Sequence, residues 1–165
     1  MILPDVNVLV YAFRCDSEEH DVYRSWLEGV INGATTYGVS PQVLASVIQI
    51  TTHLRVYKRP SRLSDALAFA SVIRDQPQCQ IIEPGPRHWS IFTALCQSSH
   101  TYGNLVQHAW LAALAIEHGC EWITNDRDYA RFEGLQWRTL SDLRLNALTT
   151  SSSPLAGHPP VRKTL

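Results

Sequence analysis

Two acidic motifs, each directly after an apolar run, lie near opposite ends of the region that carries most of the chain's hydrophobic residues. Asp5 stands in ILPDVNVLVYAF, and Asp126 and Asp128 stand in CEWITNDRDYARF. A carboxylate that follows a strand lies at the carboxyl edge of an α/β sheet, where open sheets bind ligands. Clustered carboxylates repel one another, so a hard divalent cation such as Mg²⁺ would stabilise them. The pattern predicts metal-assisted phosphate chemistry.

Each motif also has a purely structural explanation, which is the simpler one when either motif is taken alone. Asp is favoured at the start of turns and at helix N-caps. Asp5 would then begin a turn, and Asp126 and Asp128 would cap a short helix. Only the combination of the two motifs favours a shared site.

Length and composition indicate one domain over residues 1–145. The chain has 165 residues, of which 45% are hydrophobic, so it can bury a core without metal or disulfide support. Its net charge of −1 gives no general attraction to nucleic acid, so any RNA contact must be local. The four cysteines are widely spaced without a CxxC pair, which indicates reduced thiols and a cytoplasmic protein.

The start of the chain is read as a strand and not as a signal peptide, because Asp5 and Asn7 interrupt its apolar run. No apolar stretch approaches the roughly 20 residues that a membrane-spanning helix needs. We therefore expect no membrane association.

The hydrophobic periodicity predicts strands that alternate with helices. The predicted strands cover residues 2–10, 35–39, 79–83, 121–124 and 135–138. The predicted helices cover residues 17–32, a segment beginning at Pro41 after the cap Ser40, 63–75, about 89–96, 104–117 and 127–132. This alternation predicts an α/β fold with a parallel sheet covered on both faces. Residues 146–165 are rich in Ser, Pro and Thr and are predicted to form a flexible tail.

Four segments give the chain a resemblance to a known family. The strings PDVNVLVYAF, SPQVLASVIQITTH, GNLVQHAWLAALAIEHGCEWITNDRDYARF and LQWR occur in the order seen in PIN domains. The chain resembles in particular the VapC-type toxins of bacterial toxin–antitoxin pairs. The resemblance implies a three-layer α/β/α sandwich with a central parallel sheet, and Mg²⁺- or Mn²⁺-dependent endoribonuclease activity on RNA. It also implies a cognate antitoxin protein and a homodimer.

The same resemblance assigns roles to single residues. Asp5 matches the first family acid and Asp126 the acid of a TxDxDF-like motif, here TNDRDY, with Thr124 and Asp128 at its flanking positions. Two positions depart from the pattern: Ser46 stands where the family has Glu, and His108 where it has Asp. The hydroxyl of Ser46 can hydrogen-bond a water molecule bound to the metal ion. At position 108, however, the loss of a carboxylate weakens binding of a hard cation.

His108 and Asn7 each have two interpretations. If Asn104 is a helix N-cap that forms a capping box with Gln107, His108 lies in the first turn, where the helix dipole favours a neutral ring. Such a ring can bind Mn²⁺ or Zn²⁺, or it can simply hydrogen-bond Asp5 or Asp126. Asn7 on an extended chain would share the face of Asp5 and orient its carboxylate, or it would close a turn.

A basic segment is a weaker candidate for RNA binding. Four cations lie near Tyr57 without an acid, namely Arg55, Lys58, Arg59 and Arg62, and Arg127 follows the second acidic motif. Such residues can bind RNA phosphates beside an aromatic ring, although a solvated loop is the commoner explanation.

Two other functions remain open at this point. One is a catalytically inactive PIN scaffold that binds an antitoxin or RNA, which Ser46 and His108 favour. The other is a phosphohydrolase with Asp5 as nucleophile. It is the weaker hypothesis, because the sequence reads DVN and not the DxD of aspartyl-phosphate enzymes.

Overall fold

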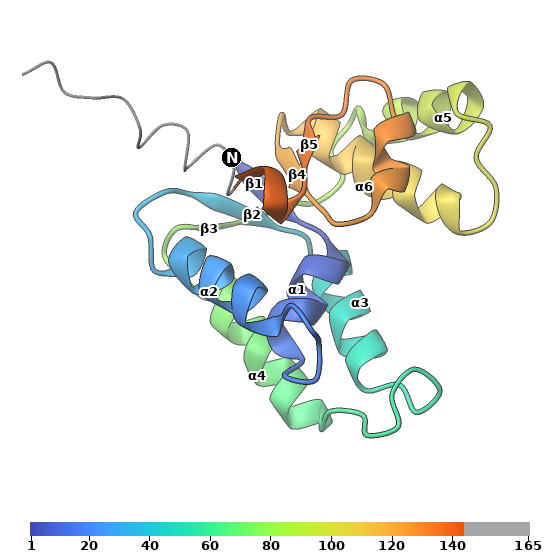
Figure 1. Cartoon of the computed structure of the whole chain (residues 1–165). Helices are drawn as coiled ribbons and strands as arrows, with labels where there is room; N and C mark the ends of the chain where they lie inside the picture. Colours follow the sequence, from blue (N-terminus) through green and yellow to red (C-terminus); the bar gives the residue numbers. More distant parts are fainter. Residues whose placement is uncertain (144–165) are drawn as a thin grey trace, which may run out of the picture.

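A parallel sheet of five strands in the order β3-β2-β1-β4-β5 forms the centre of the structure (Figure 1). The computed structural model describes residues 1–143. The strands are β1 (Ile2–Pro4), β2 (Tyr37–Val39), β3 (Cys79–Ile81), β4 (Glu121–Ile123) and β5 (Trp137–Arg138). All four pairings between neighbouring strands are parallel. The predicted α/β class with a central parallel sheet is therefore confirmed.

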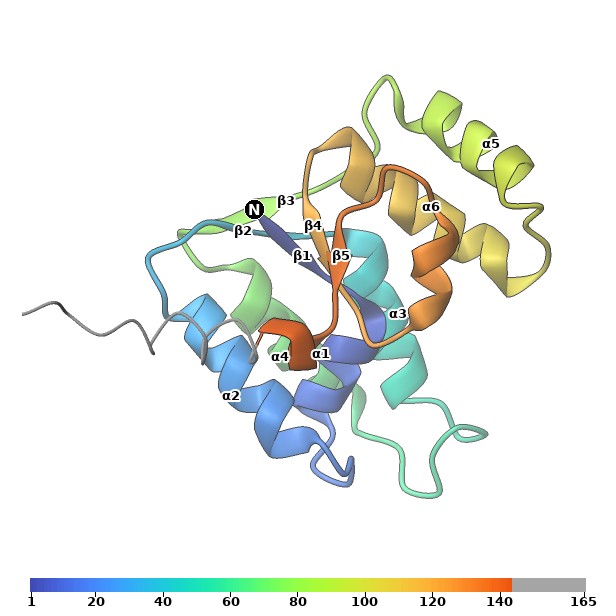
Figure 2. The ribbon, with the colours of Figure 1, turned by 45° about the horizontal axis from the view of Figure 1, so that its top comes forward.

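Helices cover both faces of the sheet, which gives three layers (Figures 1 and 2). One layer holds α1 (Val6–Phe13), α2 (His20–Ile31), α3 (Pro41–Thr51) and α4 (Leu63–Arg74). The other holds α5 (His88–Ser98) and α6 (Asn104–Glu117), with the short 3-10 helix η1 (Arg127–Arg131) against α6. A further helical turn begins at residues 140–143. The helices of each layer pack on one another, α1 on α2 and α3, and α5 on α6.

The order of the strands creates a crevice between β1 and β4. The chain builds outward from β1 to β2 and β3, then returns to place β4 on the other side of β1. Pro4 is in register with Ile123, and the backbone N–H of Asp5 donates to the carbonyl of Ile123 at 2.9 Å. Ligands of open α/β sheets bind where the strand order reverses in this way. The residues that follow β1 and β4 therefore share one edge of the sheet.

The prediction of a strand over residues 2–10 is wrong after Pro4. Asp5 is extended and caps α1, because its carboxylate accepts a hydrogen bond from the Val6 N–H at 2.6 Å. The following run is buried on most faces, including Val8, Leu9 and Val10. An apolar run rich in valine reads equally as a buried strand or a buried helix, and the cap decides between them.

Other predicted elements agree closely with the structure. α3 begins at Pro41, and the Ser40 hydroxyl accepts from the Gln42 N–H at 3.3 Å. α6 covers Asn104–Glu117 as predicted, but the capping box of Asn104 and Gln107 is wrong. Gly103 is the residue before the helix, with a φ of 54° that glycine tolerates and no side chain to cap it.

Three other expectations concern the whole chain. The domain limit at residue 145 and the tail over 146–165 lie outside the described residues. Among the described helices, none has the length and apolar character needed to cross a membrane. All four cysteines, Cys15, Cys79, Cys96 and Cys120, are free.

The connection from β3 to α5, which carries the chain to the other layer, is fixed by Glu117 at the end of α6. Its carboxylate accepts from the backbone N–H groups of Gly85 and Arg87, both at 2.8 Å. A β-carbon on Gly85 would lie 2.7 Å from the Glu117 Oε1 atom, so a larger residue there would displace the Glu117 carboxylate. Burial raises the pKa of Glu117, but the two backbone hydrogen bonds outweigh burial and lower it.

Glu117→Gln should destabilise the fold by about 1–3 kcal/mol, because the new amide can accept from only one of the two N–H groups and leaves the other without a partner. The lowered pKa means that the carboxylate stabilises the protein above its ordinary pKa of 4.5 and loses this effect as pH falls through the folded value. Urea unfolding at pH 7 and pH 3.5 measures this. Glu18→Gln, at an exposed position, is the control; an equal loss at both pH values would contradict the assignment.

Candidate active site

Asp5 lies buried at the end of β1 and is held by three hydrogen bonds. Only 4% of its surface is exposed. Besides the Val6 N–H, its carboxylate accepts from the Thr124 hydroxyl at 2.6 Å and from the Asn7 side-chain amide at 2.9 Å. Thr124, fully buried after β4, also accepts from the Asn7 amide at 3.1 Å and from the Asp126 N–H at 3.0 Å. Thr124 and Asn7 thus orient Asp5, but Asn7 does so from the first turn of α1 and not from an extended chain.

Burial governs the charge of Asp5. Loss of hydration raises its pKa from 3.8 to about 6, even though the hydrogen bonds from Thr124 and Val6 and the nearby His108 lower it. Repulsion from Asp126 adds a smaller increase. A positive charge placed in this crevice would reverse the balance and favour the carboxylate.

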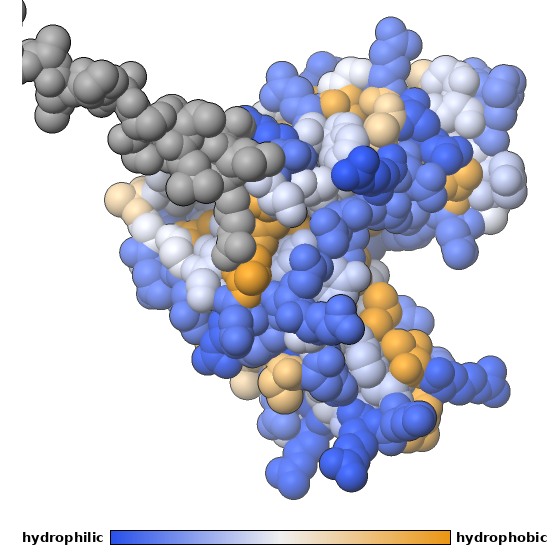
Figure 3. Space-filling view, viewed as in Figure 1, coloured by the Kyte–Doolittle hydropathy of each residue, from blue (hydrophilic) through white to orange (hydrophobic). Residues whose placement is uncertain are grey.

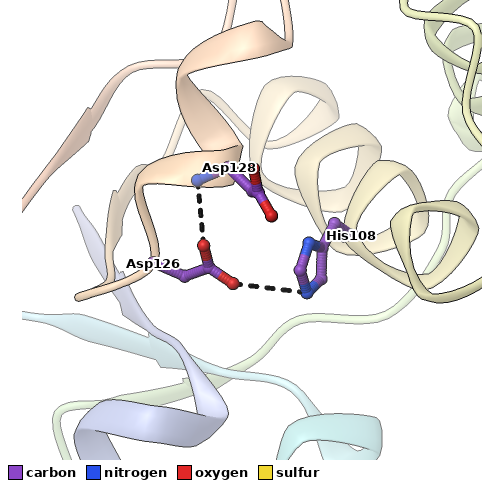
Figure 4. Close-up of side chains that lie close together, drawn as sticks. All are labelled: His108, Asp126 and Asp128. Atoms are coloured by element: carbon purple, nitrogen blue, oxygen red, sulfur yellow. Dashed lines mark hydrogen bonds and ion pairs between the residues drawn. The ribbon is translucent and has the colours of Figure 1, made fainter.

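Asp126, Asp128 and His108 converge from η1 and α6, as Figure 4 shows. Asp126 caps η1 through its Oδ1 atom, which accepts from the Asp128 N–H at 2.9 Å. Its Oδ2 atom lies 3.6 Å from the His108 Nε2 atom. This distance is too long for a hydrogen bond, so the predicted His108 hydrogen bond is not made in this geometry. A role as helix cap and a role as metal ligand are compatible for Asp126, because each uses a different oxygen of its carboxylate.

The three side chains fit a divalent ion. One ligand atom from each of His108, Asp126 and Asp128 lies within 4.8 Å of the others. The His108 Nδ1 atom is buried and, among the described residues, has no hydrogen-bond partner. The His108 ring stacks on Tyr129, with ring centres 4.9 Å apart, which fixes its orientation. Two carboxylates and an imidazole form a mixed oxygen and nitrogen set that suits Mn²⁺ or Zn²⁺ better than Mg²⁺.

Asp5 is not part of this three-residue cluster but faces the same cleft. A hollow of about 390 Å³ is lined by Asp5, Asn7, Ser46, His108 and Asp126, among others. Figure 3 shows the indentation between the part of the surface over α5 and α6 and the part over α3. Ser46 and His108, the two positions that depart from the family pattern, are therefore brought to one site with the acids.

A second hollow, of about 590 Å³, opens on the other side of the cluster. It shares His108 and Asp126 with the first and adds Asn104, Asp128 and Arg131 to its lining. The Asp128 carboxylate already accepts a hydrogen bond from the Arg131 guanidinium at 2.9 Å. Arg131 would compete with an ion for this oxygen.

The predicted RNA-binding cations lie outside both hollows. Arg55, Lys58, Arg59 and Arg62 are exposed in the connection from α3 to α4. Arg14 at the end of α1 fixes this connection: it donates to the Arg59 carbonyl at 3.1 Å and to the Ser61 hydroxyl at 2.9 Å, and it lies over the Tyr57 ring at 4.0 Å. The segment therefore has a defined conformation.

Arg127 is exposed as well and belongs to a different region. It slightly lowers the pKa of Asp142, whose main stabilising contacts are its hydrogen bonds with Thr139. Arg127 thus lies near the helical turn at residues 140–143 and lines neither hollow.

Several residues that line the cleft were not predicted from the sequence. Tyr11, Ile50, Leu111 and Tyr129 line the smaller hollow, and so does Gln107, which the sequence assigned to a helix cap. Tyr129 follows Asp126 by three residues and Tyr11 follows Asp5 by six, so proximity to the acids was a signal. The apolar ones read as ordinary core positions, because periodicity does not distinguish a core from a pocket wall.

Comparison with known proteins gives a consistent family. The family model described as PIN domain matches residues 2–135. Ribonuclease VapC43 of Mycobacterium tuberculosis is 39% identical over 138 residues, which cover 84% of this chain and 94% of that protein. Ribonuclease VapC25 of the same organism is 37% identical over 82% of this chain and 96% of its own length.

Solved structures with low sequence identity share the fold. The structure of VapBC2 from Rickettsia felis, bound to a DNA fragment from its promoter, superposes with a TM-score of 0.61. That alignment covers 84% of this chain and 98% of the other, at 21% identity. Fold, family match and close relatives agree, and the chain therefore belongs to the PIN-domain family, in the group of the VapC proteins.

Proposed function

We propose that this protein is the toxin of a toxin–antitoxin pair and acts as a divalent-metal-dependent endoribonuclease. The observation that carries the proposal is the gathering of acidic side chains where the strand order reverses: Asp5 and Asp126 line one hollow, and Asp126 and Asp128 line the adjoining one. Several relatives above 30% identity are named ribonuclease VapC, which supports RNA as the substrate. The test is cleavage of RNA by the purified protein with Mg²⁺ or Mn²⁺, compared with EDTA.

The residues of the cleft would have different roles in this reaction. His108, Asp126 and Asp128 would hold the divalent ion, and Asp5 would complete its surroundings. When bound, the ion lowers the pKa of a water molecule and neutralises charge on the phosphodiester. Thr124 and Asn7 keep Asp5 in place, and Ser46 offers a hydroxyl to water at the opposite wall. Because one of these three ligands is an imidazole, Mn²⁺ matches them better than Mg²⁺ does.

The partners follow from the same family. The neighbour VapBC2 was solved as a complex bound to promoter DNA, which supports a cognate antitoxin for this chain. A homodimer is proposed from the resemblance, with residues 1–145 as the folded domain. The four free cysteines support a location in the cytoplasm.

An inactive scaffold is the second candidate. The imidazole at position 108 and the Arg131 contact with Asp128 both weaken a site for a hard cation. Titration with Mg²⁺ and Mn²⁺, followed by calorimetry, distinguishes the two functions, because an inactive scaffold should bind neither ion in the cleft. The phosphohydrolase hypothesis is weakened further, since both oxygens of Asp5 already accept hydrogen bonds.

Asp5→Asn should lower ribonuclease activity by about 100-fold or more, the scale seen when a charge-stabilising group is removed from an active site. Its raised pKa means that the ionised side chain destabilises the metal-free fold above pH 6. Asn also turns one accepting oxygen into a donor, which lowers stability at every pH. The stability of the variant relative to the wild type should therefore rise with pH, by on the order of 1–3 kcal/mol between pH 4 and pH 7. Activity assays and thermal unfolding in EDTA check both. Asp21→Asn, an exposed acid, is the control; cleavage at the wild-type rate by Asp5→Asn would refute the carboxylate site.

His108→Asp should strengthen Mg²⁺ binding on the order of tenfold, the scale that changes around metal sites produce, and raise cleavage. In the wild type, Mn²⁺ binding should weaken in acid because an imidazole must be neutral to bind a metal. Calorimetry and RNA cleavage measure the two effects. If His108→Asp neither binds Mg²⁺ more tightly nor cleaves RNA, the double variant with Ser46→Glu distinguishes the two functions. Recovered RNA cleavage indicates a nuclease that has lost activity, and absence of cleavage supports an inactive scaffold.

Replacing Arg55, Lys58, Arg59 and Arg62 by Gln should weaken binding of single-stranded RNA and reduce its salt dependence. Each lost phosphate contact should flatten the logarithmic slope by about 0.7. Arg14 is retained, so the segment stays anchored, and ion affinity in the cleft should not change. Fluorescence anisotropy between low and moderate salt measures the slope, with Arg74→Gln as a control outside the segment. An unchanged slope would mean that the segment is a solvated loop.

A further inference from the structure

The smaller hollow of the cleft is larger and more apolar than an ion site requires. Its volume is about 390 Å³, which lies in the range of pockets that bind small organic groups. Besides the acids, it is lined by Val10, Ile50 and Leu111 and by the ring of Tyr11. Figure 3 shows hydrophobic side chains along the border that α3 forms. Water and a cation alone do not account for these walls.

Two polar groups in this hollow have hydrogen-bonding capacity to spare. Within residues 1–143, the side chains of Ser46 and Gln107 make no hydrogen bond, although both line the hollow. Asp5 and Asn7, by contrast, are committed to each other and to Thr124. An amide presents a donor and an acceptor side by side, which is the pattern that side-chain amides use to bind the edge of a base.

The two hollows are lined by different kinds of side chain and share His108 and Asp126. The larger one is lined by Asn104, Asp128 and Arg131, with His108 and Asp126 as the shared wall. A phosphodiester held at this wall has one neighbouring unit on each side. The larger hollow suits sugar and phosphate, whereas the apolar walls of the smaller hollow, which include Tyr11 and Ile50, suit a flat base that stacks on aromatic and apolar side chains.

We propose that the smaller hollow binds one unstacked nucleobase next to the cleaved phosphodiester, and that Gln107 and Ser46 determine which base is preferred. The half-buried side chains of Tyr11 and Ile50 contact the faces of the base. This inference rests on the proposed nuclease function. It restricts the substrate to single-stranded RNA, because a paired and stacked base cannot enter a side pocket.

Single-turnover cleavage of matched oligoribonucleotides tests the inference. The set varies only the base beside the cleaved bond and includes an abasic unit at that place and a fully paired duplex. The abasic and duplex substrates should be cleaved about 10- to 100-fold more slowly, the scale of one lost base-stacking contact. Gln107→Ala should reduce the differences among the four bases without changing Mn²⁺ affinity, whereas Gln49→Ala, exposed on α3 outside the hollow, should not. Equal rates on intact and abasic substrates would overturn the inference.

A binding measurement separates failure of the pocket from failure of the nuclease. In EDTA, uncharged nucleosides should shift the NMR signals of the Gln107 amide and the Ile50 methyl groups, and ribose alone should not. Nucleoside binding without RNA cleavage would sustain the pocket and reject the nuclease. RNA cleavage without base preference or nucleoside binding would sustain the nuclease and reject the pocket.

Discussion

The hydroxyl of Thr124 is the contact on which the site depends. It donates to the Asp5 carboxylate and accepts from the Asn7 amide and the Asp126 N–H, so its one proton and two lone pairs are all used. The bond joins the ends of two adjacent strands across 119 positions of sequence. Since Thr124 is fully buried, water cannot replace these contacts, and the protein alone fixes the relative position of Asp5 and Asp126.

The same two carboxylates, those of Asp5 and Asp126, cap helices and line the cleft. Asp5 caps α1, and Asp126 caps η1 with one oxygen while the other faces His108. A neutral amide in place of either carboxylate can still cap. Capping therefore explains why these side chains lie where they do, and it does not require their charge. The burial that raises the pKa of Asp5 makes the same point, because the fold itself does not benefit from that charge.

The imidazole of His108 changes the electrostatics of the cleft. It lowers the pKa of Asp5, and it adds no carboxylate charge next to Asp126. Its stacking on the buried Tyr129 holds the ring in the wall between the two hollows. Ser46 leaves the α3 side of the smaller hollow uncharged. Ser46 and His108 thus both influence the charge of the cleft.

The sequence by itself determined the fold class, the limits of α6, the start of α3 and the chemical type of the acidic residues. These depend on local signals: the Ser40 and Pro41 cap, the apolar helix from Asn104, and carboxylates after strand ends. The helix α1 was missed because a valine-rich run fits a buried strand and a buried helix equally. Only the tertiary structure placed β4 beside β1, since strand order depends on the path of the whole chain. That neighbourhood brings Thr124 to Asp5. It also places Gln107, which the sequence assigned to a helix cap, and the core residue Leu111 at the wall of a pocket.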